Sequence, residues 1–486
     1  MMMSGKKSIE KSLDRRDFIK TFGLTAAGSI LFNLHDIKGF TQQGGKPNII
    51  FIMADDLGYG DLGCYGQTKI KTPYLDKMAL EGMKFTSAYS GSPVCAPSRS
   101  CLMTGQHTGH TTVRENKSGI TDERVPLNKG DKTVAEVLKE AGYTTGMIGK
   151  WGLGEPGNSG EPNRQGYDYF FGYLNQNHAH YYYPEYLWRN SEKVYIPENK
   201  NGNREVYSHD LFAQESIKFI EKNKDNPFFL YIPFTIPHAE LLVPENSMKD
   251  YDGKFVEDKP FINEKGKNGY ATQMKPHAAY AAMISRMDKD IGNIFKKLKD
   301  LGIDDNTIVF FTSDNGPSDA GGIDAEFFNS TGPLRGAKHD LYEGGIRVPM
   351  IVRWPGKIAA NSNTDQPFAF WDFLPTAAEI AKSNVPSKID GISIAPTLFN
   401  GNQKQHKYYY WEYRARKKNF LQAVRFGNWK AVRMNPGDEI ELYNLKYDLA
   451  EKNNVASEHP DLIAKAETYF LEAHTESVHW PMKIID

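Results

Sequence analysis

The fold class is decided at residues 47–56, which read PNIIFIMADD. The apolar run from Pro47 to Ala54 is typical of a strand that is buried on both faces of a sheet. It ends at Asp55 and Asp56, and open α/β sheets place their functional sites outside the carboxyl ends of such strands. We therefore predict a buried central strand that delivers two carboxylates to a site.

Short apolar runs and helical patterns alternate along most of the remaining chain. Strands are predicted at 85–89, 143–148, 228–234, 308–312 and 348–352, and helices at 73–81, 97–102, 132–141, 277–300 and 372–382. This alternation predicts an α/β fold in which a large mixed central sheet is flanked by helices on both faces.

The sequence pattern changes near residue 405. Short strand patterns follow at 408–413, 422–425, 429–433 and 441–444, with a helix near 462–474. They predict a smaller C-terminal antiparallel sheet with one helix. We expect a leader at 1–45, a catalytic α/β domain at 46–404 and this subdomain at 405–486. The segment 155–204 has little periodicity and is interpreted as an elaborated loop over the site.

The N-terminus carries Arg15 and Arg16 ahead of a mostly apolar stretch at 21–34. This pattern predicts an export signal of twin-arginine type, and an amphipathic helix packed on the domain is the alternative. The apolar stretch is too short and too interrupted to span a bilayer, so we expect no stable membrane span. We expect the leader to be removed before Lys46, and a periplasmic or extracellular product in a bacterial source.

Composition excludes several other classes of protein. The formal net charge of −1 over 486 residues gives no basic footprint for nucleic acid, so we expect no nucleic-acid partner. The cysteines are Cys64, Cys95 and Cys101, which allow at most one disulfide and form no CxxC zinc pattern.

Two kinds of segment carry candidate chemistry. Residues 95–99 read CAPSR, with proline and arginine at fixed offsets from Cys95; a buried cysteine before a helix that begins at Pro97 is an equally good explanation of this segment alone. Asp55 and Asp56 repel each other in a small space unless a cation relieves them. The second acidic strand end, at 314–315, could complete a site for a hard divalent ion, although an Asx turn or helix cap explains each pair alone.

Together these segments resemble the formylglycine-dependent sulfatases, an arylsulfatase-like family of the alkaline phosphatase superfamily, and the resemblance extends over 47–445. It implies an alkaline-phosphatase-like fold. It also implies that a formylglycine-generating maturation enzyme converts Cys95 to formylglycine (3-oxoalanine), whose hydrate attacks a sulfate ester. The resemblance further implies one calcium ion per chain, with the ligands Asp55, Asp56, Cys95, Asp314 and Asn315.

The resemblance assigns roles to basic residues as well. Arg99 would hold the aldehyde hydrate, and Lys150 and Lys338 would contact the sulfate. His238 would face the ester oxygen, and either His238 or Lys338 would donate the proton to the leaving group. Such fixed cations lower the barrier because negative charge develops on the sulfate and on the leaving oxygen.

The chain departs from the family pattern at Gly152. The family usually has a histidine two residues after the lysine, where this chain reads GKWGLG at 149–154. That histidine is credited with helping the hydrate to lose its proton, so the base is unassigned. His178, His180 and His339 are the candidates for it.

The segment 177–183 and Trp188-Arg189 offer aromatic faces and hydrogen-bonding groups of the kind that a sugar ring needs. We therefore expect a sulfated carbohydrate substrate, with His178, His180 and Arg189 as candidate contacts; a packed aromatic loop is the alternative. Two other functions remain open: a phosphatase, phosphodiesterase or phosphonate hydrolase of the same superfamily, and a non-catalytic protein that binds sulfated glycans.

Overall fold

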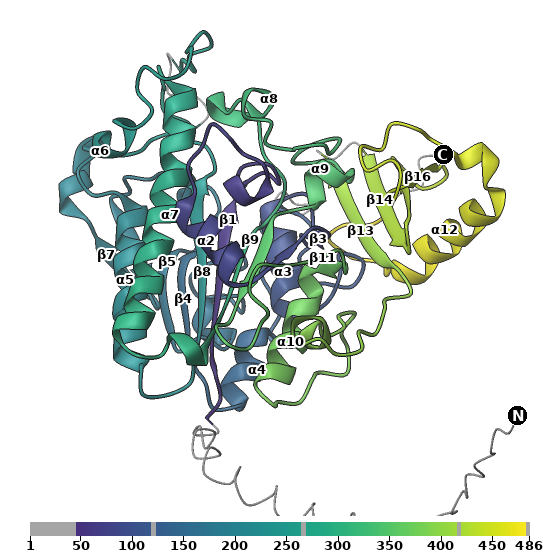
Figure 1. The fold of residues 1–486 in the computed structure, drawn as a ribbon, viewed down its shortest axis with the longest axis horizontal. Helices are drawn as coiled ribbons and strands as arrows, with labels where there is room; N and C mark the ends of the chain where they lie inside the picture. Colours follow the sequence, from purple (N-terminus) through teal and green to yellow (C-terminus); the bar gives the residue numbers. More distant parts are fainter. Residues whose placement is uncertain (1–44, 118–122, 264–268, 416–418, 483–486) are drawn as a thin grey trace, which may run out of the picture. The chain divides into compact units, whose positions relative to one another are not determined.

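The computed structural model describes residues 45–117, 123–263, 269–415 and 419–482. They form a ten-stranded mixed sheet and a separate four-stranded antiparallel sheet (Figure 1). The predicted export signal at 1–45 lies outside the described residues, except for Gly45. Within the described ranges, no helix is both long enough and apolar enough to cross a membrane.

The strand order of the main sheet brings the ends of its central strands together. Its strands lie in the order β11 (Ser362–Thr364), β2 (Met83–Phe85), β10 (Met350–Arg353), β9 (Thr307–Ser313), β1 (Asn48–Asp55), β8 (Phe228–Pro237), β4 (Thr144–Lys150), β5 (Tyr169–Tyr173), β6 (Tyr186–Arg189) and β7 (Glu192–Tyr195). The strands from β9 to β5 are parallel, and antiparallel β10 and β6 flank them. The carboxyl ends of β9, β1, β8 and β4 therefore meet at one edge.

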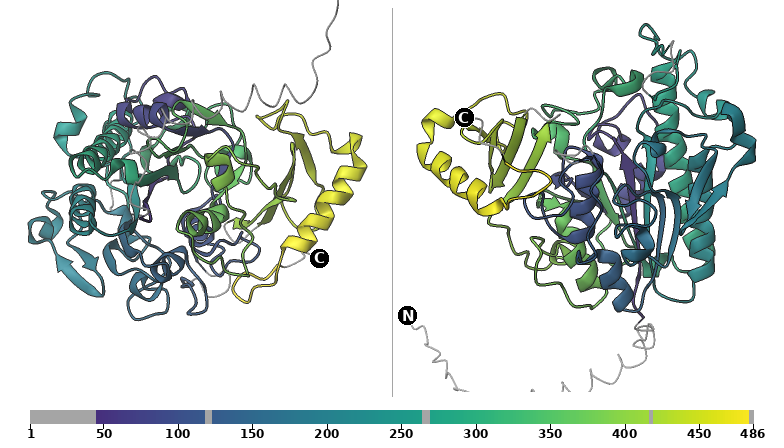
Figure 2. Two further views of the ribbon diagram at one scale, coloured as in Figure 1. Left: turned by 60° about the horizontal axis from the view of Figure 1, so that its bottom comes forward. Right: turned by 180° about the vertical axis from the view of Figure 1, so that it is seen from behind.

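The main sheet separates two apolar cores, which explains the continuous apolar run of β1. Ile49, Phe51 and Met53 belong to one core, and Ile50 and Ile52 belong to the other. Helices cover both faces of the sheet (Figures 1 and 2). The first core is lined by α3 (Cys95–Thr104), α4 (Val134–Glu140) and α10 (Phe373–Ile380), and the second by α2 (Pro73–Glu81), α5 (Ser208–Asn223) and α7 (Pro276–Asp300). The predicted α/β class is confirmed.

Helix starts follow local signals in the sequence. α2 and α7 begin at Pro73 and Pro276, where the missing N–H has no helical partner to lose. α4 begins with a capping box: the Glu136 N–H donates to the Thr133 hydroxyl at 3.2 Å, and the Thr133 N–H donates to the Glu136 carboxylate at 3.0 Å.

Two sequence predictions are wrong. The segment 155–204 is more than a loop, because it supplies β5, β6 and β7 to the main sheet and buries Phe170 and Leu187. The predicted strand at 85–89 is split into β2 and β3 (Ala88–Tyr89), because β2 pairs in the main sheet whereas β3 pairs with β12 (Phe368–Ala369).

The smaller antiparallel sheet agrees with its prediction. Its strands are β13 (Tyr409–Ala415), β14 (Asn419–Phe426), β15 (Trp429–Arg433) and β16 (Glu441–Asn444). The helix α12 (Pro460–Ala473) packs Tyr469 and Phe470 against Val424 and Leu442 of this sheet. The domain boundary at 404/405 stays a prediction.

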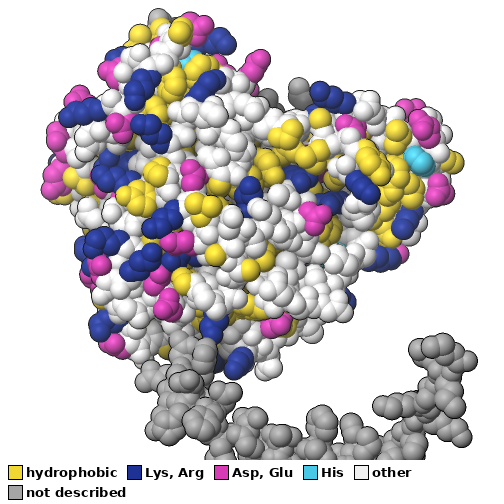
Figure 3. Space-filling model, viewed as in Figure 1, with side chains coloured by type: hydrophobic (Ala, Val, Ile, Leu, Met, Phe, Trp, Pro, Cys, Tyr) yellow, Lys and Arg dark blue, Asp and Glu magenta, His cyan; other side chains and the backbone are white. Residues whose placement is uncertain are grey.

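Charged side chains of both signs are interspersed on the face seen in Figure 3. Neither sign forms a continuous field over the described residues of this face, which agrees with the formal net charge of −1.

A buried ionic cluster joins the C-terminal sheet to the main body. Lys430 of β15 lies 2.9 Å from Glu343 Oε1 and 2.9 Å from Glu451 Oε1, and all three side chains are fully buried. Glu343 begins α9 (Glu343–Ile346), and its second carboxylate oxygen accepts hydrogen bonds from Arg347 at 2.9 Å and from the Tyr89 hydroxyl at 2.7 Å. Lys430 is thus the cation between two buried carboxylates.

We predict that Lys430→Met destabilises the protein by about 3–5 kcal/mol, because it leaves Glu343 and Glu451 without their shared cation. Urea unfolding measures the loss. The matched control is Lys407→Met, which removes an exposed ion pair with Glu472 and should cost under about 1 kcal/mol. Equal losses in the two variants would contradict the prediction.

Candidate active site

Polar side chains from distant segments meet at the carboxyl edge of the central strands. Asp55 ends β1, Lys150 ends β4, His238 follows β8 and Asp314 follows β9. The start of α3 and the loop before α9 add the remaining members, which are Cys95, Arg99 and Lys338. All of these side chains are at most 9% exposed, so they form a buried polar site.

The turn after β1 is fixed by the end of β9. Asp56 has a φ of 63°, a left-handed conformation that Asp tolerates better than most residues. Its N–H donates to Asp314 Oδ1 at 3.2 Å, and the Leu57 N–H donates to Ser313 Oγ at 2.9 Å. The carboxylates of the two strand ends are therefore held beside each other.

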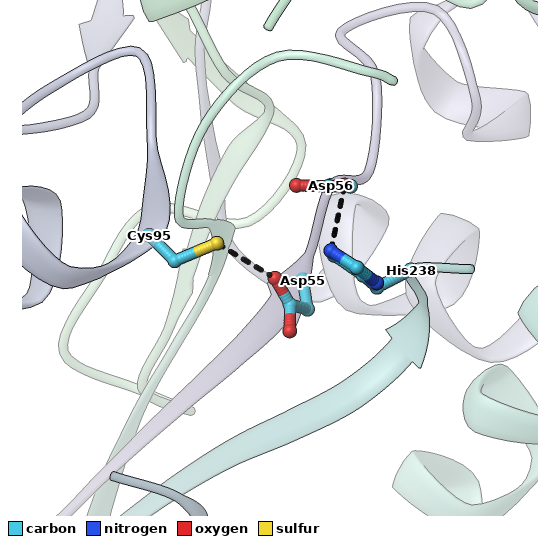
Figure 4. A group of neighbouring side chains, drawn as sticks. All are labelled: Asp55, Asp56, Cys95 and His238. Carbon is cyan, nitrogen blue, oxygen red and sulfur yellow. Dashed lines mark hydrogen bonds and ion pairs between the residues drawn. The ribbon is translucent and has the colours of Figure 1, made fainter. Parts of the chain in front are cut away.

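The donor atoms of this site fit a cation. One ligand atom each from Asp55, Asp56, Cys95 and His238 lie within 4.8 Å of one another (Figure 4). Asn315 Nδ2 donates to Asp56 Oδ1 at 2.7 Å, whereas Asn315 Oδ1 is buried and has no hydrogen-bond donor among the described residues. Several carboxylates and an unpaired amide oxygen form the donor set that a hard divalent cation prefers.

Three cations balance the three carboxylates. Lys150 Nζ lies 2.6 Å from Asp55 Oδ2, and Lys338 Nζ lies 2.7 Å from Asp56 Oδ1. Arg99 Nη2 donates to Asp314 Oδ2 at 2.7 Å, and Arg99 Nη1 donates to the Lys150 carbonyl at 2.6 Å. Because these charges are buried, the interactions between them are strong and the groups are fixed in place.

Burial and neighbouring charges set the protonation of the central groups. Burial raises the pKa of the Cys95 thiol to about 12, although Lys150 and Lys338 oppose the shift. Burial, followed by Lys338 and Lys150, lowers the pKa of His238 well below its usual value. Burial would lower the pKa of Lys338, but Asp56 and other nearby anions raise it well above the usual value. At neutral pH Cys95 is thus a thiol, which is a poor nucleophile, His238 is neutral and Lys338 is protonated.

The structure brings one predicted substrate residue to the site. The segment 178–180 is a short 3₁₀ helix, and the ring of His180 stacks on that of His238 with 4.1 Å between centroids. His178 instead packs between the rings of Tyr173 and Tyr186, at 4.9 and 4.6 Å.

Arg189 and His339 contact other groups. Arg189 lies on β6, is 45% exposed, and contacts Tyr169 at 3.2 Å and Glu215 at 3.7 Å. None of its described contacts is a residue of the active site. His339 Nδ1 lies 2.7 Å from the hydroxyl of Tyr413, a residue of the C-terminal sheet.

Sequence reasoning missed Gln176, which occupies the space beside Gly152. A Cβ on residue 152 would lie 2.5 Å from Gln176 Nε2, so any other side chain there would displace this amide. Gly152 also has a φ of 81°, which L-residues rarely adopt. Glycine at position 152, where the family usually has histidine, was the signal in the sequence that could have pointed to this space. The sequence alone does not show that Gln176 fills it.

The mixed α/β sheet, with acidic, basic and cysteine side chains at its strand ends, has the alkaline-phosphatase-like fold. The Sulfatase family model matches residues 47–383, and the model for N-sulphoglucosamine sulphohydrolase, C-terminal, matches residues 337–472. The chain belongs to the sulfatase family and is an enzyme, a sulfuric ester hydrolase.

Named relatives and a solved structure agree with this family. The chain is 31% identical to N-acetylgalactosamine-6-sulfatase of Mus musculus over 479 residues, which cover 93% of this chain and 83% of that protein. It is 30% identical to N-acetylgalactosamine-6-O-sulfatase of Bacteroides thetaiotaomicron, covering 87% and 92%. The crystal structure of Ps i-CgsB in complex with k-i-k-neocarrahexaose is similar at 28% identity with a TM-score of 0.74, covering 90% of this chain and 95% of that one.

We predict that Gly152→His destabilises the protein by about 2 kcal/mol or more, because the new side chain requires a left-handed backbone and collides with Gln176. In a Gln176→Gly background the collision disappears, so the same substitution should cost at least about 1 kcal/mol less. Urea unfolding of the four proteins in this cycle measures both costs. Equal costs in the two backgrounds would show that Gln176 does not occupy this space.

Proposed function

We propose that this chain removes sulfate from a sulfated carbohydrate, with a formylglycine derived from Cys95 as the nucleophile and one calcium ion as the cofactor. The main support for the proposal is the set of charged groups that surround the side chain of Cys95. Asp55 lies 3.5 Å and Lys338 3.7 Å from its sulfur, yet its raised pKa makes the unmodified thiol a poor nucleophile. The hydrated aldehyde of formylglycine would supply a hydroxyl nucleophile at this position.

Asp55, Asp56, Asp314 and Asn315 would hold the calcium ion, and the modified residue 95 would be a further ligand. The unpaired, buried Oδ1 of Asn315 supports this assignment. Bound calcium would supply positive charge that lowers the pKa of a coordinated hydroxyl, as metals do for bound water.

The basic residues would bind the sulfate, orient residue 95 and protonate the leaving group. Lys150 and Lys338 bind the sulfate oxygens, and Arg99 orients residue 95 from the first turn of α3. Lys338 donates the proton to the leaving oxygen, because its amine lies 3.7 Å from the sulfur of Cys95, where the ester would be attacked. Neutral His238 positions the ester oxygen.

His180 is our candidate for the base that the family histidine provides elsewhere. It stacks on His238, and burial, followed by His238 and nearby cations, lowers its pKa well below the usual value. Its place beside His238 is what supports this role, whereas the lowered pKa makes it a weak base. The stacking partners of His178 and the hydrogen bond of His339 make them weaker candidates.

A sulfated sugar fits the surroundings of the site. A cavity of about 310 Å³ is lined by tyrosine rings and polar groups from Tyr181, Tyr183, Arg204, Glu240, Asn263 and Tyr270. The ring of Tyr270 lies 5.9 Å from that of His180, so the cavity adjoins the site. Aromatic faces combined with hydrogen-bonding groups suit a sugar ring. The names of the relatives make N-acetylgalactosamine 6-sulfate the first sugar to test.

The proposal has two requirements in the cell. The source must make a formylglycine-generating enzyme that acts on the segment 95–99, and the leader at 1–45 would export the matured enzyme to the periplasm or the exterior of a bacterium.

We predict that protein coexpressed with a formylglycine-generating enzyme releases sulfate from N-acetylgalactosamine 6-sulfate, whereas Cys95→Ala lowers kcat at least about 10³-fold because the nucleophile is lost. Ion chromatography of the released sulfate measures both rates. Removing calcium with EDTA should abolish the activity, and added calcium should restore it.

The alternative functions give different results. Faster hydrolysis of 4-nitrophenyl phosphate than of 4-nitrophenyl sulfate would favour the phosphatase. Binding of sulfated sugars by the matured protein without turnover would favour the glycan-binding protein. A Cys95→Ala variant with more than a tenth of the original activity would contradict the proposed nucleophile.

A further inference from the structure

Two buried hydrogen-bond donors beside the active site have no acceptor among the described residues. They are Nε2 of Gln176 and Nη1 of Arg124. Gln176 is 4% exposed and the Arg124 side chain 19% exposed. Nearly all buried donors in folded proteins are paired, because an unpaired one destabilises the fold. A bound ligand whose oxygen atoms accept hydrogen bonds from these two groups would explain why they lack acceptors in the protein.

One carboxylate connects the segments that carry the two donors. Glu155 Oε1 accepts a hydrogen bond from Asn175 Nδ2 at 2.6 Å, and it lies 3.8 Å from Arg124 Nε. Asn175 directly precedes Gln176, so this carboxylate links the two segments. Asn175 Oδ1 also accepts the N–H groups of residues 177 and 178, which fixes the loop that carries Gln176.

Packing and charge effects connect the two donors with Lys150 and His238. The Gln176 amide packs against Gly152, two residues after Lys150. His180, whose ring stacks on His238, follows Gln176 by four residues, and the charge of Arg124 acts on the pKa of this histidine. Gly152 is therefore the residue that leaves room for the amide.

We propose that Gln176 and Arg124 form a recognition site for the sugar ring that carries the sulfate, with the amide and the guanidinium each donating a hydrogen bond to a sugar oxygen. The inference rests on the proposed function. Glu155 already balances the charge of Arg124, so the acceptors are neutral hydroxyl or acetamido carbonyl oxygens and not a second anion. Neither side chain exchanges a proton at neutral pH, so the pair positions the sugar and takes no part in proton transfer.

The test compares two substrates of the matured, calcium-loaded enzyme. N-acetylgalactosamine 6-sulfate offers sugar oxygens, and 4-nitrophenyl sulfate offers none. The measured quantity is kcat/KM for the sugar divided by kcat/KM for the aryl sulfate. We expect this ratio to fall about tenfold in Gln176→Ala and about 10- to 100-fold in Arg124→Ala, mainly through KM for the sugar.

Matched controls come from exposed residues of the same types. Gln214→Ala on α5, and Arg164→Ala, which removes an exposed guanidinium paired with Glu161, should keep the ratio within twofold of the original enzyme. An unchanged ratio in both Gln176→Ala and Arg124→Ala would overturn the proposal. An equal loss with both substrates would also overturn it, because that result indicates a catalytic or structural role.

A binding experiment separates this inference from the proposed function. Calorimetry on Cys95→Ala protein, which lacks the nucleophile, measures the Kd for N-acetylgalactosamine 6-sulfate with and without Gln176→Ala. A Kd about tenfold higher in the variant that carries both Cys95→Ala and Gln176→Ala supports the recognition site, even if the matured enzyme hydrolyses neither substrate. Equal Kd values contradict it.

Discussion

The pairing of buried carboxylates with buried cations at one sheet edge is the constraint on which the rest of the site depends. Parallel β1, β8, β9 and β4 bring their carboxyl ends together, and apolar packing on both faces keeps those ends away from water. Adjacent carboxylates in such a place repel each other. Lys150, Lys338 and Arg99 relieve this repulsion, and the same cations surround Cys95 with the charge that sulfate chemistry needs.

The C-terminal sheet supports this edge from outside the main sheet. Lys338 precedes Glu343 by five residues, and Glu343 is fixed by Lys430 of β15 through a fully buried ion pair. The Trp411 indole N–H of β13 donates to the Ser90 carbonyl at 3.0 Å, close to the start of α3. The C-terminal sheet therefore contacts the main body close to the segment that carries Lys338.

The parts of the fold that the sequence predicted well are those with strong local patterns. The strands β1, β8 and β9 are buried on both faces, so their sequences are continuously apolar. The short strands β5 to β7 lie among Gly-, Asn- and Tyr-rich residues, which hide their pattern. Family resemblance led to the residues that meet at Cys95, whereas the Gln176 amide lies beside Gly152 through packing between separate segments, and no local motif marks such a contact. Arg189 illustrates the opposite error. Its sequence context suggested a sugar contact, but it lies on β6, which β8, β4 and β5 separate from β1 in the sheet.

The central claim is that Cys95 is converted into the nucleophile, and one measurement addresses it most directly. Mass spectrometry of the tryptic peptide Phe85–Arg99, from active protein purified from its native host, reports the chemical state of residue 95. The account predicts a mass lower than that of the thiol form by the thiol-to-aldehyde difference. An unmodified Cys95 in fully active protein would contradict it.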